Sequence, residues 1–158
     1  MRFQRKNGTL LAVADGWAMP LSAVPDEAFS SGMLGVGFAI EPTAGTIYSP
    51  VNGSVDSVTE TGHAYTIVSE DGLDILVHVG IDTVQLKGEG FLPMVQKGDR
   101  IKKGDVLARV DLERIKKSGL PLTVPVLITS PEEIKITLSP PNSPVIGGKT
   151  AVLQYRLE

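Results

Sequence analysis

Short runs of β-branched and other apolar residues alternate with turn-forming residues along most of this chain. Dipeptides such as Glu41-Pro42, Asn52-Gly53 and Lys103-Gly104 separate the runs, and residue pairs of this kind favour turns. Short apolar runs at this spacing predict the strands of an all-β sandwich or barrel. The expected strands cover residues 10–14, 36–40, 46–48, 54–59, 63–68, 73–79, 106–110, 124–128 and 151–156.

Helix-forming signals are scarce and short. Residues 111–117 should form about two helical turns, with Asp111 as the N-cap and Gly119 beyond the C-terminal end. Residues 25–31 should form another short helix. The proline-rich residues 139–144 should form a loop before a final strand rather than a boundary between domains.

Composition narrows the range of functions. With 158 residues and a mass of 16.8 kDa, the chain has the size of one domain. A net charge of −3 without basic runs argues against binding to nucleic acid or anionic membranes. The absence of cysteine excludes disulfides, thiolate metal sites and a cysteine nucleophile in this chain. The polar N-terminus does not resemble a signal peptide, and no apolar run reaches the ~18 residues that cross a bilayer, so we expect a soluble intracellular protein.

The strongest functional signal is a predicted hairpin that carries both histidines of the chain, His63 and His78. A turn that pairs Ser69 with Gly72 places the two histidines directly opposite each other, with Cβ atoms about 4.5–5.5 Å apart. A loop made only of Asp71 and Gly72 places them on a diagonal of the same face. A shift of the register by one residue would put them on opposite faces.

The same register sorts the other hairpin residues onto two faces. The predicted core face pairs Ala64 with Val77, Thr66 with Ile75 and Val68 with Leu73. The histidines then share the less buried face with Tyr65 opposite Leu76 and Ile67 opposite Asp74.

Two facing imidazoles favour phosphoryl chemistry. One can attack a phosphoryl group as a nucleophile while the other donates a hydrogen bond to the phosphoryl oxygens. The hydroxyl of Thr61 could orient His63, and a backbone carbonyl near Gly80 could fix the tautomer of His78. Two alternatives stay open: the histidines are structural, or they bind zinc with Asp82 as a third ligand.

Several segments of the chain resemble one protein family. Its signature is similar to residues 72–84, which read GLDILVHVGIDTV, and the similarity continues through residues 85–91. Residues 61–64, which read TGHA, resemble the segment with the second histidine of the family. Upstream similarity covers residues 24–26, Phe29 and residues 35–40. The family is glucose-class enzyme IIA, the phosphocarriers of the bacterial phosphoenolpyruvate-dependent sugar phosphotransferase system.

The resemblance implies a role for each residue around the histidines. Phospho-HPr would phosphorylate His78 on Nε2, and His63 would stabilise the phosphoryl group. Thr61 corresponds to a threonine bonded to His63, and Gly80 corresponds to a glycine whose carbonyl anchors Nδ1 of His78. The phosphoryl group would then pass to a cysteine of a IIB domain. No cofactor would be required, although the two histidines could bind zinc in a protein complex.

The resemblance also implies a surface that docks both partners around the histidines. Its members would be the apolar residues Phe29, Met33, Leu34, Leu76 and Val84, together with Asp26 and Asp82, which would meet basic HPr. Taken without the resemblance, Met33 and Leu34 suit a core equally well, and each aspartate suits a loop or a helix cap. Gly62 stands where a larger polar residue is common and Thr59 where an aromatic one is common, which could change this surface.

In fold and location, the resemblance implies an antiparallel β-sandwich or barrel-like single domain over residues 1–158. Its helices would be very short, and residues 1–9 would form a flexible N-terminus. We expect it in the cytoplasm, either alone or as the IIA portion of a larger permease. The cysteine that takes the phosphoryl group would lie outside this chain, which has none.

Other functions stay open at this point. A non-catalytic regulatory module of the same fold could use the same surface to bind transporters or kinases. Residues 49–55 and 95–106 are similar to biotinyl or lipoyl carriers, but no modified lysine at a hairpin tip is evident. A zinc hydrolase of related topology would need a third metal ligand beside the two histidines.

Overall fold

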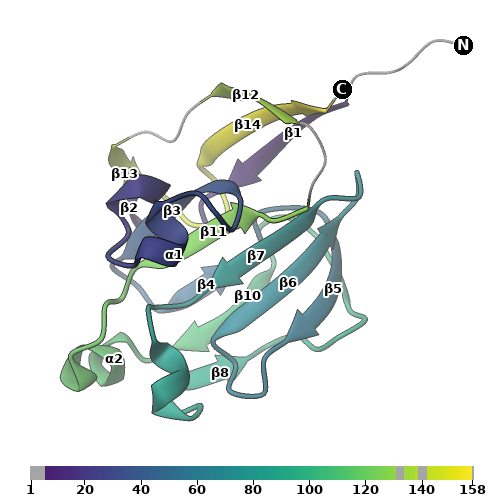
Figure 1. The fold of residues 1–158 in the computed structure, drawn as a ribbon. Coiled ribbons are helices and arrows are strands. Elements are labelled where there is room, and N and C mark those ends of the chain that lie inside the picture. Colours follow the sequence, from purple (N-terminus) through teal and green to yellow (C-terminus); the bar gives the residue numbers. More distant parts are fainter. Residues whose placement is uncertain (1–5, 131–133, 139–141, 158) are drawn as a thin grey trace, which may run out of the picture.

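The computed structural model describes residues 6–130, 134–138 and 142–157, which form antiparallel sheets (Figure 1). The largest sheet contains, in spatial order, β13 (Ser143–Val145), β2 (Gly16–Pro20), β3 (Val36–Pro42), β11 (Val124–Ile128), β7 (Asp74–His78), β6 (Ala64–Ser69), β5 (Gly53–Val58) and β9 (Arg100–Ile101). A second sheet contains β4 (Thr46–Tyr48), β10 (Val106–Val110) and β8 (Phe91–Pro93), and a third contains β1 (Lys6–Leu11), β14 (Ala151–Leu157) and β12 (Ile134–Leu138). The predicted all-β, antiparallel class is confirmed.

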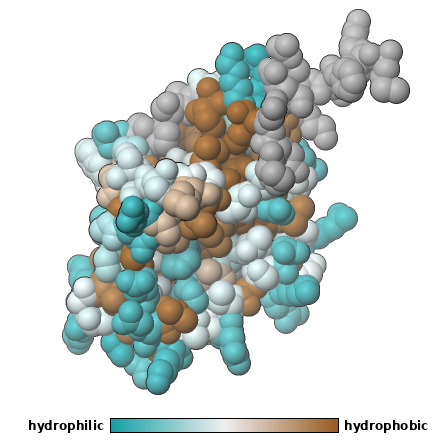
Figure 2. All heavy atoms as spheres, viewed as in Figure 1, coloured by the Kyte–Doolittle hydropathy of each residue, from teal (hydrophilic) through white to brown (hydrophobic). Residues whose placement is uncertain are grey.

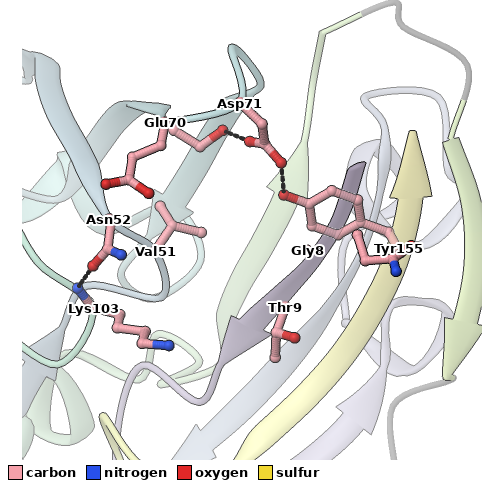
Figure 3. Close-up of a pocket in the computed structure, with 10 residues that line it drawn as sticks. Gly8, Thr9, Val51, Asn52, Glu70, Asp71, Lys103 and Tyr155 are labelled. Atoms are coloured by element: carbon pink, nitrogen blue, oxygen red, sulfur yellow. Dashed lines mark hydrogen bonds between the residues drawn. The ribbon is translucent and has the colours of Figure 1, made fainter. Parts of the chain in front are cut away.

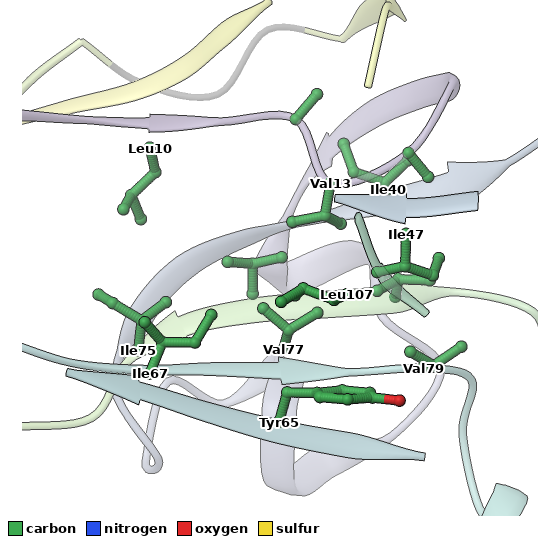
Figure 4. Packing of buried hydrophobic residues seen from close by; sticks show 14 of the residues in the cluster. Leu10, Val13, Ile40, Ile47, Tyr65, Ile67, Ile75, Val77, Val79 and Leu107 are labelled. Atoms are coloured by element: carbon green, nitrogen blue, oxygen red, sulfur yellow. The ribbon is translucent and has the colours of Figure 1, made fainter. Parts of the chain in front are cut away.

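The inner faces of the sheets enclose a hydrophobic core. Buried positions alternate along β7, so Ile75 and Val77 face the core while His78 faces outward. All residues of β11 are buried, because β3 and β7 pair with its two edges and apolar clusters cover both of its faces. Figure 4 shows Ile75 and Val77 packed in one core with Leu10 of β1 and Leu107 of β10.

Two short α-helices form where the sequence predicts them. α1 (Glu27–Ser30) begins after Asp26, whose side chain accepts a hydrogen bond from a backbone amide of the first turn. α2 (Leu112–Ser118) begins after Asp111 and ends at Gly119, where a left-handed φ of 81° suits glycine. Among the described residues, none of the helices is both long and apolar enough to cross a membrane.

A smaller apolar cluster covers part of the outer face of the largest sheet. α1 and the 3₁₀-helix η1 (Leu21–Ala23) pack there against β3 and β11 (Figure 1). The cluster consists of Leu21, Val24, Phe29, Ala39, Ile81 and Leu127, with Met19 and Leu76 packed beside it. In Figure 2, which has the same orientation, apolar residues gather in the upper middle of this face, with polar residues around and below them. This cluster places α1 beside the end of β7.

Part of the N-terminus that was expected to be flexible lies in a strand. Residues 6–9 belong to β1 and pair with β14. Gly8 makes this pairing compatible with an aromatic neighbour, since a Cβ atom there would lie 2.0 Å from Cζ of Tyr155. The predicted strand over residues 10–14 is displaced along the chain, because β1 begins at Lys6 and ends at Leu11. Residues 1–5 lie outside the described residues.

Five strands were not predicted from the sequence: β2, β8, β9, β12 and β13. β8, β9 and β13 contain two or three residues each, too few to show an alternating pattern. β13 also corrects the predicted loop over residues 139–144, because Ser143 and Pro144 pair with β2. Residues 139–141 of that predicted loop lie outside the described residues.

A hydrogen-bonded cluster ties the C-terminal strand to the hairpin that carries the histidines. Tyr155 of β14 donates a 2.6 Å hydrogen bond to Oδ2 of Asp71, and Oδ1 of Asp71 accepts one from the Ser69 hydroxyl. The cluster lies in the wall of a cavity of about 490 Å³ (Figure 3). Burial and the hydrogen bond to Asp71 both raise the pKa of Tyr155, so its hydroxyl remains a donor at neutral pH.

Replacement of this tyrosine should measurably destabilise the fold. Tyr155→Phe should lower the free energy of unfolding by about 1–3 kcal/mol, because Asp71 loses one of its two hydroxyl donors. Urea denaturation followed by circular dichroism would measure the change. Tyr65→Phe is the matched control, because the buried hydroxyl of Tyr65 has no hydrogen-bond partner among the described residues and its removal should cost no stability. Equal losses in the two variants would contradict this assignment.

Candidate active site

His78 is the last residue of β7, and its side chain lies on the outer face of the largest sheet. The ring is half-buried because Phe29 of α1 packs against it, with ring centroids 5.2 Å apart and planes inclined by 57°. Asp26 caps the short helix that supplies Phe29. The helix cap and the apolar cluster below α1 therefore fix one side of the His78 imidazole.

The predicted register of the hairpin is wrong by one residue. β6 and β7 pair Ala64 with His78 and Tyr65 with Val77, not Ala64 with Val77. The reason is the turn, in which the Ser69 amide donates to the carbonyl of Leu73, so the loop holds the three residues 70–72. Three-residue loops with glycine in the left-handed region are common in hairpins, and Gly72 has a φ of 86°.

This shift exchanges the predicted faces of β6. Tyr65 and Ile67 are fully buried in the core with Ile75 and Val77, whereas Thr66 and Val68 share the outer face with β7 residues such as Leu76. By strand alternation alone, the true register should therefore separate the two histidines. They nevertheless meet, with ring centroids 5.1 Å apart and planes at 78°.

The histidines meet because His63 lies outside strand β6, in the turn that precedes it. The Gly62 amide donates to the carbonyl of Thr59, and Gly62 has a φ of 75°, in the left-handed region that favours glycine. The Val79 amide then donates a 2.7 Å hydrogen bond to the carbonyl of His63, which joins this turn to the end of β7. The turn reverses the direction of the His63 side chain, so the imidazole comes to the His78 side.

Hydrogen bonds to Nδ1 orient both imidazoles. Nδ1 of His78 lies 2.7 Å from the carbonyl oxygen of Gly80, and a carbonyl only accepts, so Nδ1 carries the hydrogen. Nε2 of a neutral His78 is then left with a free lone pair. Nδ1 of His63 lies 2.5 Å from the Thr61 hydroxyl and 3.3 Å from the Thr59 hydroxyl. The contacts that the sequence predicts for Thr61 and Gly80 are both present.

Thr83, which the sequence analysis did not single out, holds the turn after His78. Its buried hydroxyl donates a 2.5 Å hydrogen bond to the Val79 carbonyl, at the start of the 3₁₀-helix η2 (Thr83–Leu86). A Cβ atom on Gly80 would lie 2.3 Å from Cγ2 of Thr83, and Gly80 has a φ of 77°. Only glycine therefore suits this position, which directs the Gly80 carbonyl at His78. The only sequence signal for Thr83 was its place in the motif of residues 72–84.

Both histidines are held in their neutral form near pH 7. Burial lowers the pKa of His63 from 6.5, and the neighbouring His78 lowers it further. Burial also lowers the pKa of His78, against the opposing effects of the Gly80 carbonyl and of the carboxylates of Asp26 and Asp82. A neutral imidazole with a free Nε2 lone pair is the form that can act as a nucleophile.

The residue set does not form a complete metal site. Among the described residues, no three His, Cys, Asp or Glu side chains are grouped so that they could hold a metal ion, and the structure does not bring Asp82 into such a group with the two histidines. Two imidazoles supply half of the four ligands that a structural zinc site needs. Zinc at this pair would therefore need ligands from another protein.

The family model described as phosphoenolpyruvate-dependent sugar phosphotransferase system, EIIA 1, matches residues 8–134. The chain belongs to this family. It is 40% identical over 148 residues to the glucose-specific EIIA component of Staphylococcus epidermidis, covering 94% of this chain and 89% of that protein. It is 39% identical over 158 residues to the glucose-specific EIICBA component of Streptococcus pneumoniae, covering 99% of this chain and 22% of that protein.

A solved member of the EIIA family has the same fold. Glucose permease IIA from Mycoplasma capricolum superposes with a TM-score of 0.87 and is 33% identical, covering 98% of this chain and 99% of that one. The match extends over nearly all of both chains, so the sheets that carry the histidines belong to the common EIIA fold.

The residues expected to dock EIIA partners fall into two groups. Met33, Leu34 and Val84 are exposed, with 84% of Met33 accessible, so assignment of Met33 or Leu34 to the core is wrong. Phe29 is buried against His78, and Leu76 is half-buried under α1. Asp26 caps α1, and Asp82 adopts a left-handed φ of 60° before η2. Their roles in partner binding stay predictions.

Proposed function

We propose that this chain is a phosphocarrier that accepts a phosphoryl group from phospho-HPr on Nε2 of His78 and passes it to a cysteine of a IIB domain. The observation that carries this proposal is the hydrogen bond from Nδ1 of His78 to the Gly80 carbonyl. It leaves the Nε2 lone pair free, next to a second imidazole that can contact an incoming phosphoryl group. Membership in the EIIA family supports the reaction class.

Each transfer is a substitution at phosphorus. In the first, the Nε2 lone pair of His78 forms an N–P bond while the bond between phosphorus and the HPr donor atom breaks and its electron pair stays with HPr. In the second, a thiolate of the IIB domain forms an S–P bond while the N–P bond breaks and its electrons return to Nε2. Such transfers depend mainly on positioning and on stabilisation of the phosphoryl charge.

His63 is the residue placed to stabilise that charge. With Nδ1 accepting from a threonine hydroxyl, a neutral His63 carries its hydrogen on Nε2 and can donate it to a phosphoryl oxygen. The negative charge of a phosphoryl group on His78 would also favour protonation of His63, which strengthens the hydrogen bond. The two imidazoles thus have different tasks, set by different partners at Nδ1.

Fused relatives support a IIB domain as acceptor. The Streptococcus pneumoniae EIICBA component and the Bacillus subtilis β-glucoside-specific EIIBCA component carry B and C portions together with the region similar to this chain. Because this chain has no cysteine, a thiol acceptor must come from another domain or protein. We also propose that the reaction takes place in the cytoplasm, as expected for a phosphocarrier of the EIIA family.

The docking surface fits partners with an apolar contact and a basic rim. Exposed Met33 and Leu34 follow α1 in the chain and exposed Val84 lies in η2, and Phe29 of α1 lies directly against His78. Asp26 and Asp82 act on His78 as nearby negative charges, so they would also attract a basic donor protein. Regulatory targets could use the same apolar residues.

The proposal is tested by phosphoryl transfer with purified proteins. HPr that carries a radioactive phosphoryl group should label this chain with an acid-labile, alkali-stable phosphate, and a suitable IIB domain should remove the label. Absence of labelling, with the fold intact and the HPr preparation active on another EIIA protein, would refute the carrier function. Binding to a transporter or kinase without labelling would instead favour the regulatory module.

The lowered histidine pKa values predict how the reaction depends on pH. Protonation of Nε2 removes the nucleophile, so the initial rate of labelling should be highest at alkaline pH and should fall to half its maximum at a pH below 6.5. Rapid-quench labelling at saturating donor would give the midpoint of the pH-rate profile. NMR titration of the His78 ring would give the midpoint of its protonation. Both should lie below 6.5, since burial lowers the pKa of His78. A midpoint above 6.5 in the NMR titration would contradict the assigned environment.

A further inference from the structure

Thr59 contacts the turn that carries His63, although it lies four residues before His63 in the sequence. Its hydroxyl oxygen accepts hydrogen bonds from two successive backbone amides, those of His63 at 3.1 Å and Ala64 at 3.0 Å. Its own amide donates a 3.0 Å hydrogen bond to the carbonyl of Ala64. Thr59 thus closes the turn that carries His63 from both its backbone and its side chain.

The same hydroxyl also faces the His63 ring. Its oxygen lies 3.3 Å from Nδ1 of His63 and 3.4 Å from the Ala64 carbonyl oxygen. A hydroxyl has one hydrogen and two acceptor lone pairs, and the two amides already use both lone pairs. The Thr59 hydroxyl can therefore donate to Nδ1, but it has no acceptor capacity left for an Nδ1 hydrogen.

The Thr61 hydroxyl is different, although it lies closer to the ring. It contacts Nδ1 of His63 at 2.5 Å, and no backbone amide is seen to donate to it among the described residues. It can donate to a neutral ring or accept from a protonated one. The Thr59 hydroxyl can therefore hydrogen-bond only to an Nδ1 without hydrogen. The Thr61 hydroxyl can hydrogen-bond to Nδ1 of His63 with or without hydrogen.

We propose that Thr59 is a second positioning residue for His63, which directs the imidazole to His78 and favours the tautomer with hydrogen on Nε2. That tautomer presents an N–H donor to a phosphoryl group on His78. The consequence for transfer rests on the proposed carrier function, whereas the tautomer assignment does not.

The tautomer is tested by NMR of the unphosphorylated protein, without any partner. Imidazole ¹⁵N shifts should show Nδ1 of His63 without hydrogen and Nε2 with hydrogen in the native chain at pH 8. Thr59→Val, which keeps the shape and removes the hydroxyl, should shift this distribution toward a mixture, and Thr59→Ser should restore it. A native Nδ1 that carries hydrogen, or an unchanged distribution in Thr59→Val, would overturn the proposal.

Ser69→Ala is the matched control for a purely structural effect. The Ser69 hydroxyl also accepts a hydrogen bond from a backbone amide, that of Leu73, but at the opposite end of β6. Its loss should destabilise the hairpin and leave the His63 tautomer unchanged. A shift of the His63 signals in Ser69→Ala as large as in Thr59→Val would show that Thr59 acts only through stability, and would overturn the proposal.

A kinetic experiment measures onward transfer to a IIB domain, the step in which His63 is proposed to act. Thr59→Val should slow transfer from the phosphorylated chain to a IIB domain by roughly five- to tenfold, the loss expected for one hydrogen bond of typical strength. The KM for phospho-HPr should stay within about twofold, because Thr59 supplies no nucleophile. Unchanged transfer in Thr59→Val would overturn the catalytic consequence. Absence of labelling in the native chain would refute the carrier function and leave the NMR result valid.

Discussion

Replacement of His78 by alanine should reduce labelling by phospho-HPr to background, a fall of more than about a thousandfold. The variant removes the only imidazole whose Nε2 lone pair is left free by a carbonyl partner at Nδ1. We do not expect His63 to take its place, because its Nδ1 has no carbonyl partner and the tautomer proposed above carries the hydrogen on Nε2. Quantitative labelling over a time course, with circular dichroism to verify the fold, would measure the effect.

His78→Asn separates the chemistry from the structure. The asparagine amide nitrogen has the position of Nδ1 and can still donate to the Gly80 carbonyl, so the turn after β7 should stay intact, yet no nucleophilic nitrogen is present. Both variants should therefore be equally inactive, with His78→Asn the more stable of the two. Substantial labelling of either variant would show that another residue accepts the phosphoryl group and that the assignment of His78 is wrong.

Replacement of His63 should have a different signature. His63→Ala should still accept a phosphoryl group on His78, because the nucleophile and its Gly80 partner are unchanged. Onward transfer to a IIB domain should fall by about 100-fold or more, because one positioned donor to the phosphoryl charge is lost. The measurement is a single-turnover transfer from isolated phosphorylated protein to the IIB domain.

His63→Gln is the informative companion to His63→Ala. Glutamine retains an N–H donor, so it should recover part of the onward rate if hydrogen bonding is what His63 provides. Full loss in both variants would indicate that a protonated imidazole is needed. If both variants transferred at the native rate, His63 would have no part in the reaction.

The class of fold and the two histidines were predictable because their signals are local. Turn dipeptides and apolar runs fix where strands begin and end, and Asp111 and Gly119 mark a helix by their own side-chain and backbone properties. The short strands β8, β9 and β13 have no such signal, since their pairing depends on neighbours far along the chain. They are determined by the packed sheets rather than by their own residues.

The contact between the two histidines was predicted correctly, but the strand register on which that prediction rested was wrong. Strand alternation in an assumed register brought His63 and His78 together, but the loop after Ser69 shifts that register by one residue. The contact survives because Gly62 and Thr59 take His63 out of the strand. A positive φ at one glycine and a hydroxyl that accepts two amides are tertiary details that an apolar-polar pattern does not contain.

The support of His63 by a turn has a consequence for protein design. A side chain on a strand can be moved to a partner only in steps of two residues, because intermediate positions point to the opposite face. A side chain on a closed turn is free of that constraint, and Thr59 and Gly62 set its direction within a few neighbouring residues. A two-histidine site of this geometry could therefore be transplanted onto another antiparallel sheet by exchange of one turn and one substitution, a histidine at the end of the neighbouring strand.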